Sequence, residues 1–105
     1  MSEDRLQEAR EIINGIDRDM ARLFERRMEA VRQIAEYKRA HGLPAYDAAR
    51  EQAIIQRNSA LIADPLLRDE YVQFIHAVMD LSKQYQYRLA EAENETESGR
   101  HSGRG

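Results

Sequence analysis

Apolar residues recur at alternating intervals of three and four along the N-terminal part of the chain. The series comprises Leu6, Ala9, Ile13, Ile16, Met20, Leu23, Ala30, Ile34 and Tyr37, with Arg27 at one of the same positions. This is the a/d spacing of a helix that packs lengthwise against other helices. It continues without a break through Asn14-Gly15, so the pattern predicts one helix over about residues 4–39.

Turn residues then divide the rest of the chain into two further helices. Gly42 and Pro44 end the first helix, because glycine suits a helix C-cap and proline prevents the helix from resuming. Asp47 is placed to cap a second helix over about residues 48–63. Asp64-Pro65 opens a third helix. Two seams follow its length: Leu67, Tyr71, Phe74, Val78, Leu81 and Tyr85, and Ile75, Met79, Ser82 and Gln86. The sequence therefore predicts an all-α fold.

The length of the first helix predicts an oligomer. At 1.5 Å per residue the helix is about 50 Å long. A compact domain of this size has a radius of gyration of about 13 Å. The apolar seam of such a helix needs cover from another chain, so we expect an intertwined homodimeric helical bundle.

The C-terminal residues differ in composition from the rest. No large apolar residue follows Leu89, and residues 91–105 are rich in Glu, Ser and Gly. We therefore expect a helical domain over residues 1–90 and a disordered polar tail over residues 91–105.

Composition removes several classes of protein. The chain has 105 residues, no cysteine and a formal net charge of −3. The absence of cysteine excludes a disulfide scaffold and a thiolate metal site, and the charge argues against a nucleic-acid binder. No apolar run is long enough for a membrane span, and the first residues lack the apolar core of a secretory signal. The three histidines, His41, His76 and His101, lack metal-ligand spacing. We expect a small soluble cytoplasmic protein without metal or cofactor.

Arginine makes up 14 of the 16 basic residues, and only Lys38 and Lys83 are lysine. Arginine binds carboxylates with a rigid two-pronged fork, although genomic base composition also favours arginine codons. The positions of the arginines therefore matter more than their number. Arg27 occupies a core position of the heptad, where an unpaired guanidinium costs several kcal/mol. Its partner is either an internal carboxylate, such as Glu51 or Asp47, or a bound anion.

Other polar side chains fit the second possibility. Lys38 lies on nearly the same helix face as Arg27, about 16 Å along the axis, so the two can hold a small dianion between them. Arg10 is about 25 Å from Arg27 on the same helix and can reach only a partner chain's pocket. Arg50 and Glu51 begin the second helix, where exposed N–H groups favour anions. Ser82 and Gln86 interrupt an apolar seam, either for a helix–helix hydrogen bond or for a ligand.

These residues match a known family in order and spacing. The segment RMEAVRQIAEYK, from Arg27 to Lys38, precedes Gly42-Leu43-Pro44-Ala45-Tyr46-Asp47 and Arg50-Glu51. Upstream Arg10, Ile13 and Ile16-Asp17, and downstream Met79-Asp80-Leu81-Ser82 and Gln86, extend the match over residues 5–90. The set resembles the all-helical chorismate mutases. Ala45 departs from the pattern, because a larger aliphatic residue is common there, and this puts the packing of the loop over the site in doubt.

The resemblance implies an intertwined homodimer that rearranges chorismate to prephenate in phenylalanine and tyrosine biosynthesis, without a cofactor. It implies that Arg27 and the partner chain's Arg10 bind the substrate carboxylates, with Arg50 and Ser82 completing these contacts. Lys38 and Gln86 would address the ether oxygen of the breaking bond. Asp47 and Glu51 would face the ring hydroxyl. The catalytic set is then Lys38, Gln86, Arg27 and Glu51.

Three alternatives stay open at this point. An isochorismate pyruvate-lyase on the same fold would use the same cationic pocket for a near-identical dianion. The chain would also fit a mutase domain cut from a longer two-domain enzyme. A non-catalytic helical dimerisation module would place Arg27 and Lys38 in structural ion pairs, and it would bind no small dianion.

Overall fold

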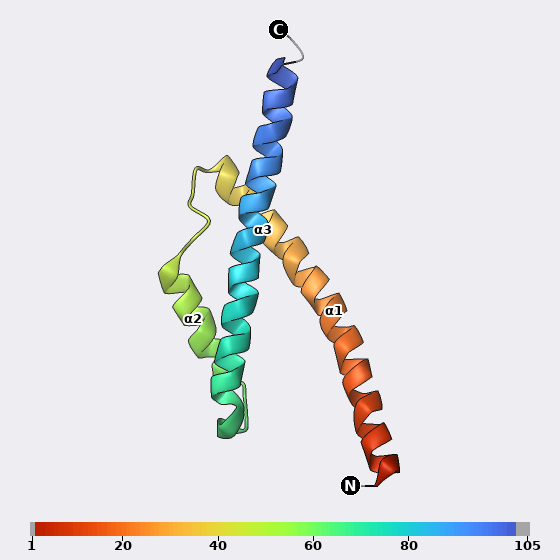
Figure 1. Cartoon of the computed structure of the whole chain (residues 1–105). Helices are drawn as coiled ribbons and strands as arrows, with labels where there is room; N and C mark the ends of the chain where they lie inside the picture. Colours follow the sequence, from red (N-terminus) through yellow and green to blue (C-terminus); the bar gives the residue numbers. More distant parts are fainter. Residues whose placement is uncertain (1, 103–105) are drawn as a thin grey trace. The chain divides into compact units, whose positions relative to one another are not determined.

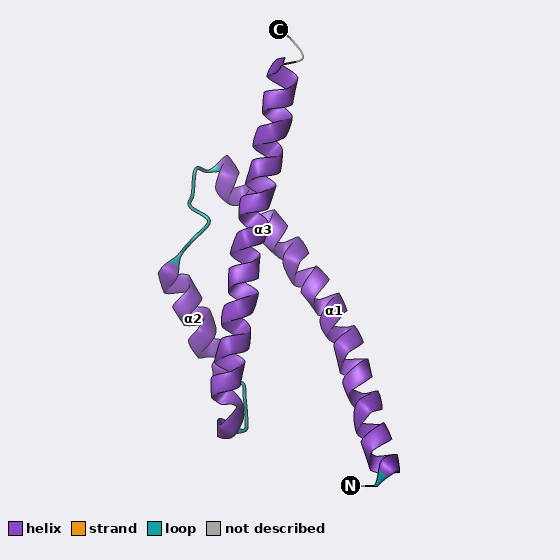
Figure 2. Ribbon diagram, in the orientation of Figure 1, coloured by secondary structure: helices purple, strands orange, loops and turns teal. Residues whose placement is uncertain are grey.

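The computed structural model describes the backbone of residues 2–102 and the side chains of residues 2–94. The elements follow in the order α1 (Glu3–Ala40), α2 (Ala48–Ser59), the 3-10 turn η1 (Pro65–Leu67) and α3 (Arg68–Ser102). Figure 2 shows that helices account for the described chain apart from short connecting loops. Within residues 2–102 there is no β-strand, so the predicted all-α fold of three helices is confirmed.

Helix α1 is unbroken through Asn14-Gly15, as the apolar spacing predicts. It ends in a Schellman motif around Gly42, whose φ of +65° lies in the left-handed region that glycine tolerates. The Leu43 N–H donates to the Lys38 carbonyl at 2.7 Å, and the Gly42 N–H donates to the Arg39 carbonyl at 3.3 Å. These bonds turn the chain sharply just after Lys38.

Helix α2 begins at the predicted cap. The Asp47 carboxylate accepts a hydrogen bond from the Arg50 N–H at 3.1 Å. The helix ends at Ser59, earlier than the sequence predicts. Turn hydrogen bonds replace helical ones there: the Leu61 N–H donates to the Asn58 carbonyl and the Ile62 N–H to the Ser59 carbonyl. Asn and Ser are weak helix formers, which explains the early end.

The core of residues 31–105 lies between α2 and α3. Ile55 of α2 and Ile75 and Met79 of α3 are buried together. Ile54, Tyr71, Val72 and Val78 pack around them. In Figure 1, α2 lies beside the N-terminal half of α3, which contains Ile75 and Met79. Asp64 caps η1 by accepting from the Leu66 N–H at 3.0 Å, and α3 follows directly.

Helix α3 continues past the point where the sequence predicts a disordered tail. Residues 91–102 are helical, so the expected start of disorder at Glu91 differs from the structure. Glu91, Ala92 and Glu93 are good helix formers, and Glu93 pairs with Arg39 of α1 at 2.5 Å. The remaining tail residues, 103–105, lie outside the described part of the chain.

The chain divides into two units, residues 1–30 and residues 31–105. The first unit is helical and carries a stripe of exposed apolar side chains. Ile13, Ile16 and Leu23 are 55%, 50% and 56% exposed. Across residues 2–102, no helix combines the length and apolar character needed to cross a membrane.

Candidate active site

Lys38 and Gln86 line the same cavity, although they are far apart in the sequence. The cavity has a volume of about 190 Å³. Its other walls are Ala35 and Arg39 of α1, Leu43 and Ala45 of the following loop, and Tyr87 and Ala90 of α3. The apolar walls and the turn at Gly42 hold the two polar side chains at one place. The structure thus brings together the two residues for which the sequence predicts a shared task.

The polar groups of this cavity are only partly satisfied within the chain. The Gln86 carbonyl oxygen Oε1 is buried and has no hydrogen-bond partner among the described residues. Lys38 Nζ donates to the Ala45 carbonyl at 3.1 Å. A buried amide oxygen without a partner costs about 1–3 kcal/mol, so such a group commonly marks a ligand site.

Ser82 lies one turn before Gln86 and is the most buried polar residue described, with 6% of its surface exposed. Its hydroxyl donates to the Val78 carbonyl at 2.8 Å. This bond is the ordinary back-bond of a helical serine, which the sequence allowed as one of two interpretations.

Glu51 is half-buried in the first turn of α2, and it pairs with Lys83 of α3. The Lys83 Nζ to Glu51 Oε1 distance is 3.2 Å, and Lys83 also lies 3.4 Å from Asp80 Oδ1. Asp47 caps the same helix through Oδ1. The two acidic residues therefore lie at the N-terminus of α2, where both complement the helix dipole.

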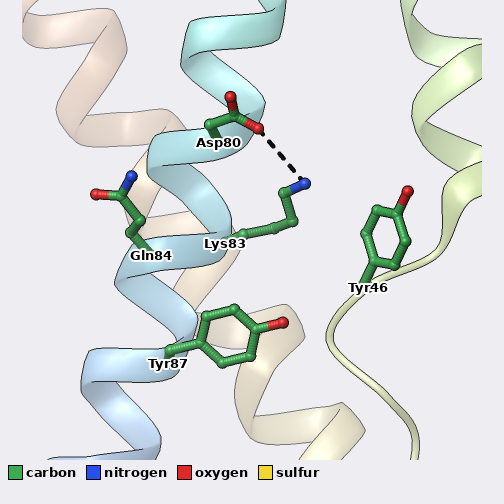
Figure 3. A pocket seen from close by; sticks show the side chains of 5 residues that line it. All are labelled: Tyr46, Asp80, Lys83, Gln84 and Tyr87. Carbon is green, nitrogen blue, oxygen red and sulfur yellow. Dashed lines mark ion pairs between the residues drawn. The ribbon is translucent and has the colours of Figure 1, made fainter.

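A second cavity of about 440 Å³ surrounds the Lys83 side chain. It is lined by Tyr46, Asp80, Lys83, Gln84 and Tyr87. Figure 3 shows the Lys83 ammonium between Asp80 and the Tyr46 ring, whose centroid is 4.6 Å from Nζ. Tyr87 lines both cavities, so they adjoin along α3.

Sequence reasoning gave Lys83 no role in the site. One signal was available, because Lys83 is one of only two lysines in an arginine-rich chain. The Glu51 hydrogen bond raises the pKa of Lys83 above its ordinary value, and Asp80 adds to the effect. A raised lysine pKa means that the stabilisation by this contact is complete below pH 10.5 and is lost as the pH rises through the folded-state pKa.

The arginines of the predicted site are divided between the two units. Arg10 and Arg27 belong to residues 1–30, where Arg10 is exposed and Arg27 is half-buried. Arg50 belongs to residues 31–105 and is exposed at the start of α2. Six residues of the predicted site therefore lie in the unit that contains the two cavities: Lys38, Asp47, Arg50, Glu51, Ser82 and Gln86.

His41 and His76 lie outside these cavities. His41 is exposed, with Nδ1 2.8 Å from the Tyr37 carbonyl oxygen and its ring stacked on Tyr37. His76 is exposed on α3, and the side chain of His101 lies outside the described residues. Among the described residues, no group of three His, Asp or Glu side chains is placed to hold a metal ion.

Comparison with known proteins identifies the family. The sequence pattern of the chorismate mutase type II family matches residues 9–87. The T-protein of Haemophilus influenzae is 41% identical over 51 residues, which cover 49% of this chain and 14% of that protein. The monofunctional chorismate mutase of Enterobacter agglomerans is 36% identical over 63 residues, which cover 59% of this chain and 35% of that protein. The chain thus spans well under half the length of both relatives.

The family match begins just before Arg10 and ends just after Gln86, so it contains every residue of the predicted site. It also covers the whole of α2 and the loop that carries Ala45 and Tyr46. The resemblance predicted from the sequence is confirmed, and the enzymatic interpretation is confirmed at the level of the family. The chain belongs to the chorismate mutase type II family.

Proposed function

We propose that the chain converts chorismate to prephenate by an intramolecular [3,3] rearrangement. One observation carries the proposal beyond family membership: Lys38 and Gln86 line one small cavity with apolar walls. A cationic donor and an amide in such a cavity suit a substrate that develops negative charge on one oxygen. The substrate is a small dianion, and the reaction requires no metal, cofactor or covalent nucleophile.

The reaction sets two tasks for the protein. The C–O ether bond breaks while a C–C bond forms between the enolpyruvyl arm and the ring. The arm must first be held over the ring, so that the reacting carbons meet in the correct orientation. Because the reaction is already intramolecular, the gain comes from selecting the reactive conformer of the arm and not from joining two reactants. Cationic side chains that bind the two carboxylates are suited to this task, and we assign it to Arg27, Arg50 and a partner's Arg10.

The second task is electrostatic. Negative charge grows on the ether oxygen as the C–O bond lengthens. The Lys38 ammonium and the Gln86 amide N–H are donors suited to that oxygen, and donors fixed in advance lower the barrier most. A lost donor of this type costs about 3–4 kcal/mol in comparable oxyanion sites. Ser82 supports the carboxylate contacts, and Asp47 and Glu51 face the ring hydroxyl.

The active form is a homodimer in this proposal. On α1 the exposed residues Ile13, Ile16 and Leu23 form an apolar stripe. From the end of η1 along α3, the exposed residues Leu67, Phe74 and Leu81 repeat at intervals of seven. Two such stripes are typical of helices that pack against a second chain. A partner would cover them and bring its Arg10 to the cavity of Lys38. We expect the dimer to be cytoplasmic and to bind no nucleic acid.

The function is tested by incubating the purified protein with chorismate and, separately, with isochorismate. We expect chorismate to disappear with formation of prephenate, identified by its conversion to phenylpyruvate in acid. Isochorismate should release no pyruvate. Release of pyruvate from isochorismate without conversion of chorismate would contradict the proposal and favour the lyase. Failure to convert either substrate would contradict the proposal and favour a non-catalytic helical module.

A further inference from the structure

Lys83 connects three segments of the structure through one ammonium group. It lies 3.2 Å from Glu51 at the start of α2, 3.4 Å from Asp80 on its own helix, and 4.6 Å from the centre of the Tyr46 ring in the loop. Its side chain is 26% exposed and that of Glu51 is 21% exposed, whereas Asp80 is 62% exposed. The contact with Glu51 is therefore the more protected of the two ion pairs.

Half-burial makes the orientation of the Glu51 carboxylate depend on this partner. A carboxylate that is partly removed from water loses solvation, and without a cation beside it the side chain gains by turning toward solvent. Lys83 opposes that movement by holding one carboxylate oxygen, Oε1. The second oxygen remains to accept a hydrogen bond from a ligand hydroxyl.

The Tyr46 ring adds a geometric restraint. Figure 3 shows the Lys83 ammonium beside the Tyr46 ring, 4.6 Å from its centroid, and a cation at this distance is attracted to an aromatic face. Tyr46 follows Ala45, whose carbonyl accepts from Lys38. The loop that covers Lys83 is thus the loop that borders the cavity of Lys38 and Gln86.

We propose that Lys83 is a positioning residue for the rearrangement, which holds the Glu51 carboxylate turned toward the hydroxyl of the substrate ring. The inference rests on the proposed function. In this proposal Lys83 does not contact the substrate, and its whole effect on catalysis passes through Glu51. Lys83 therefore differs from a residue that binds the substrate directly.

A double-mutant cycle between Lys83→Met and Glu51→Gln tests whether Lys83 acts only through Glu51. Methionine keeps the unbranched side chain beneath Tyr46 but removes the charge. We expect Lys83→Met to lower kcat/KM about tenfold, as for a lost hydrogen bond to a charged group, mainly through a higher KM. The double variant should match Glu51→Gln within about twofold, because Lys83 then has no carboxylate to position. Lys83→Arg should recover most of the activity.

Controls separate the possible failures. Arg88 lies on the same helix with its guanidinium 5.7 Å from the Tyr85 ring centre, and it is exposed. Arg88→Met therefore removes a cation from a tyrosine ring without disturbing Glu51, and it should retain wild-type kcat/KM. Circular dichroism at the assay temperature checks each fold. Lys83→Gln repeats the cycle with a polar neutral side chain, in case methionine impairs folding.

Two results would overturn the inference alone. One is an active wild-type protein whose Lys83→Met and Lys83→Gln variants are equally active. The other is a double variant whose loss is the product of the two single losses, which would place Lys83 in direct contact with the substrate. An inactive wild-type protein would instead overturn the proposed function, and the inference with it.

Discussion

Lys38→Ala is expected to reduce kcat/KM about 100-fold or more, because it removes the cation to which we assign stabilisation of the breaking C–O bond. The loss should appear mainly in kcat, since the charge on the ether oxygen develops only in the transition state. Among the described residues, the substitution removes the hydrogen bond from the Lys38 ammonium to the Ala45 carbonyl at 3.1 Å. The stability cost is therefore about 1 kcal/mol.

The matched control is Arg32→Ala, which removes a cation from the same helix. Arg32 forms an ion pair with Glu36 one turn later, at 2.9 Å, and both side chains are largely exposed. Exposed pairs of this type contribute about 0.3–0.5 kcal/mol, so this variant should keep full activity. Steady-state kinetics and thermal melting of both variants check the prediction. A Lys38→Ala variant with more than about a tenth of wild-type kcat/KM would assign the role to another residue.

Gln86→Glu is expected to be nearly inactive at neutral pH and to gain activity as the pH falls. The substitution places a carboxylate in the cavity of Lys38 and Gln86, where we propose that negative charge develops in the transition state. An ionised glutamate repels that charge, whereas a protonated glutamate can still donate a hydrogen bond. Neighbouring Lys38 lowers the pKa of the introduced carboxyl and burial raises it, so the balance sets where activity returns.

The measurement is kcat/KM against pH for the wild-type protein and the variant. A neutral amide does not titrate, so the wild-type profile should be nearly flat across neutrality. Gln73→Glu adds the same charge at an exposed position of the same helix and should follow the wild-type profile. Circular dichroism shows where each fold fails. Activity equal to wild type at pH 7.5 would show that Gln86 does not face the breaking bond.

The helices and their ends were predictable because local rules determine them. The alternating apolar spacing gives α1, and the glycine at 42 and the aspartates at 47 and 64 act as the caps that the sequence predicts. The end of α2 and the length of α3 were not predictable in the same way. Weak helix formers shorten α2, while α3 gains helix-forming residues and an ion pair from Glu93 to Arg39.

The candidate site was predicted only in part. Lys38 and Gln86 were expected to share a task, and they line one cavity. Lys83 received no role, because its meaning depends on contacts with Tyr46 and Glu51, which come from other segments. Periodicity within one helix carries no information about such contacts. The catalytic and binding roles of all the predicted site residues stay predictions, and the role of Arg10 also requires a second chain.

We propose that two chains complete one active site, the partner supplying Arg10 to the cavity of Lys38 and Gln86. A heterodimer of Arg10→Ala and Lys38→Ala chains, purified through two different tags, tests this directly. One of its sites then lacks both residues and the other has both. We expect about half of the wild-type activity per dimer, although each variant alone is nearly inactive.

A heterodimer of Lys38→Ala and Gln86→Ala chains is the control, because both residues belong to the cavity of a single chain. Each of its two sites carries one defect, so this pair should remain inactive. Chorismate consumption by the three dimers at equal concentration is the decisive measurement. Recovery in the Arg10 pair alone is the predicted result. An inactive Arg10 pair, or equal activity in both pairs, would contradict the shared site.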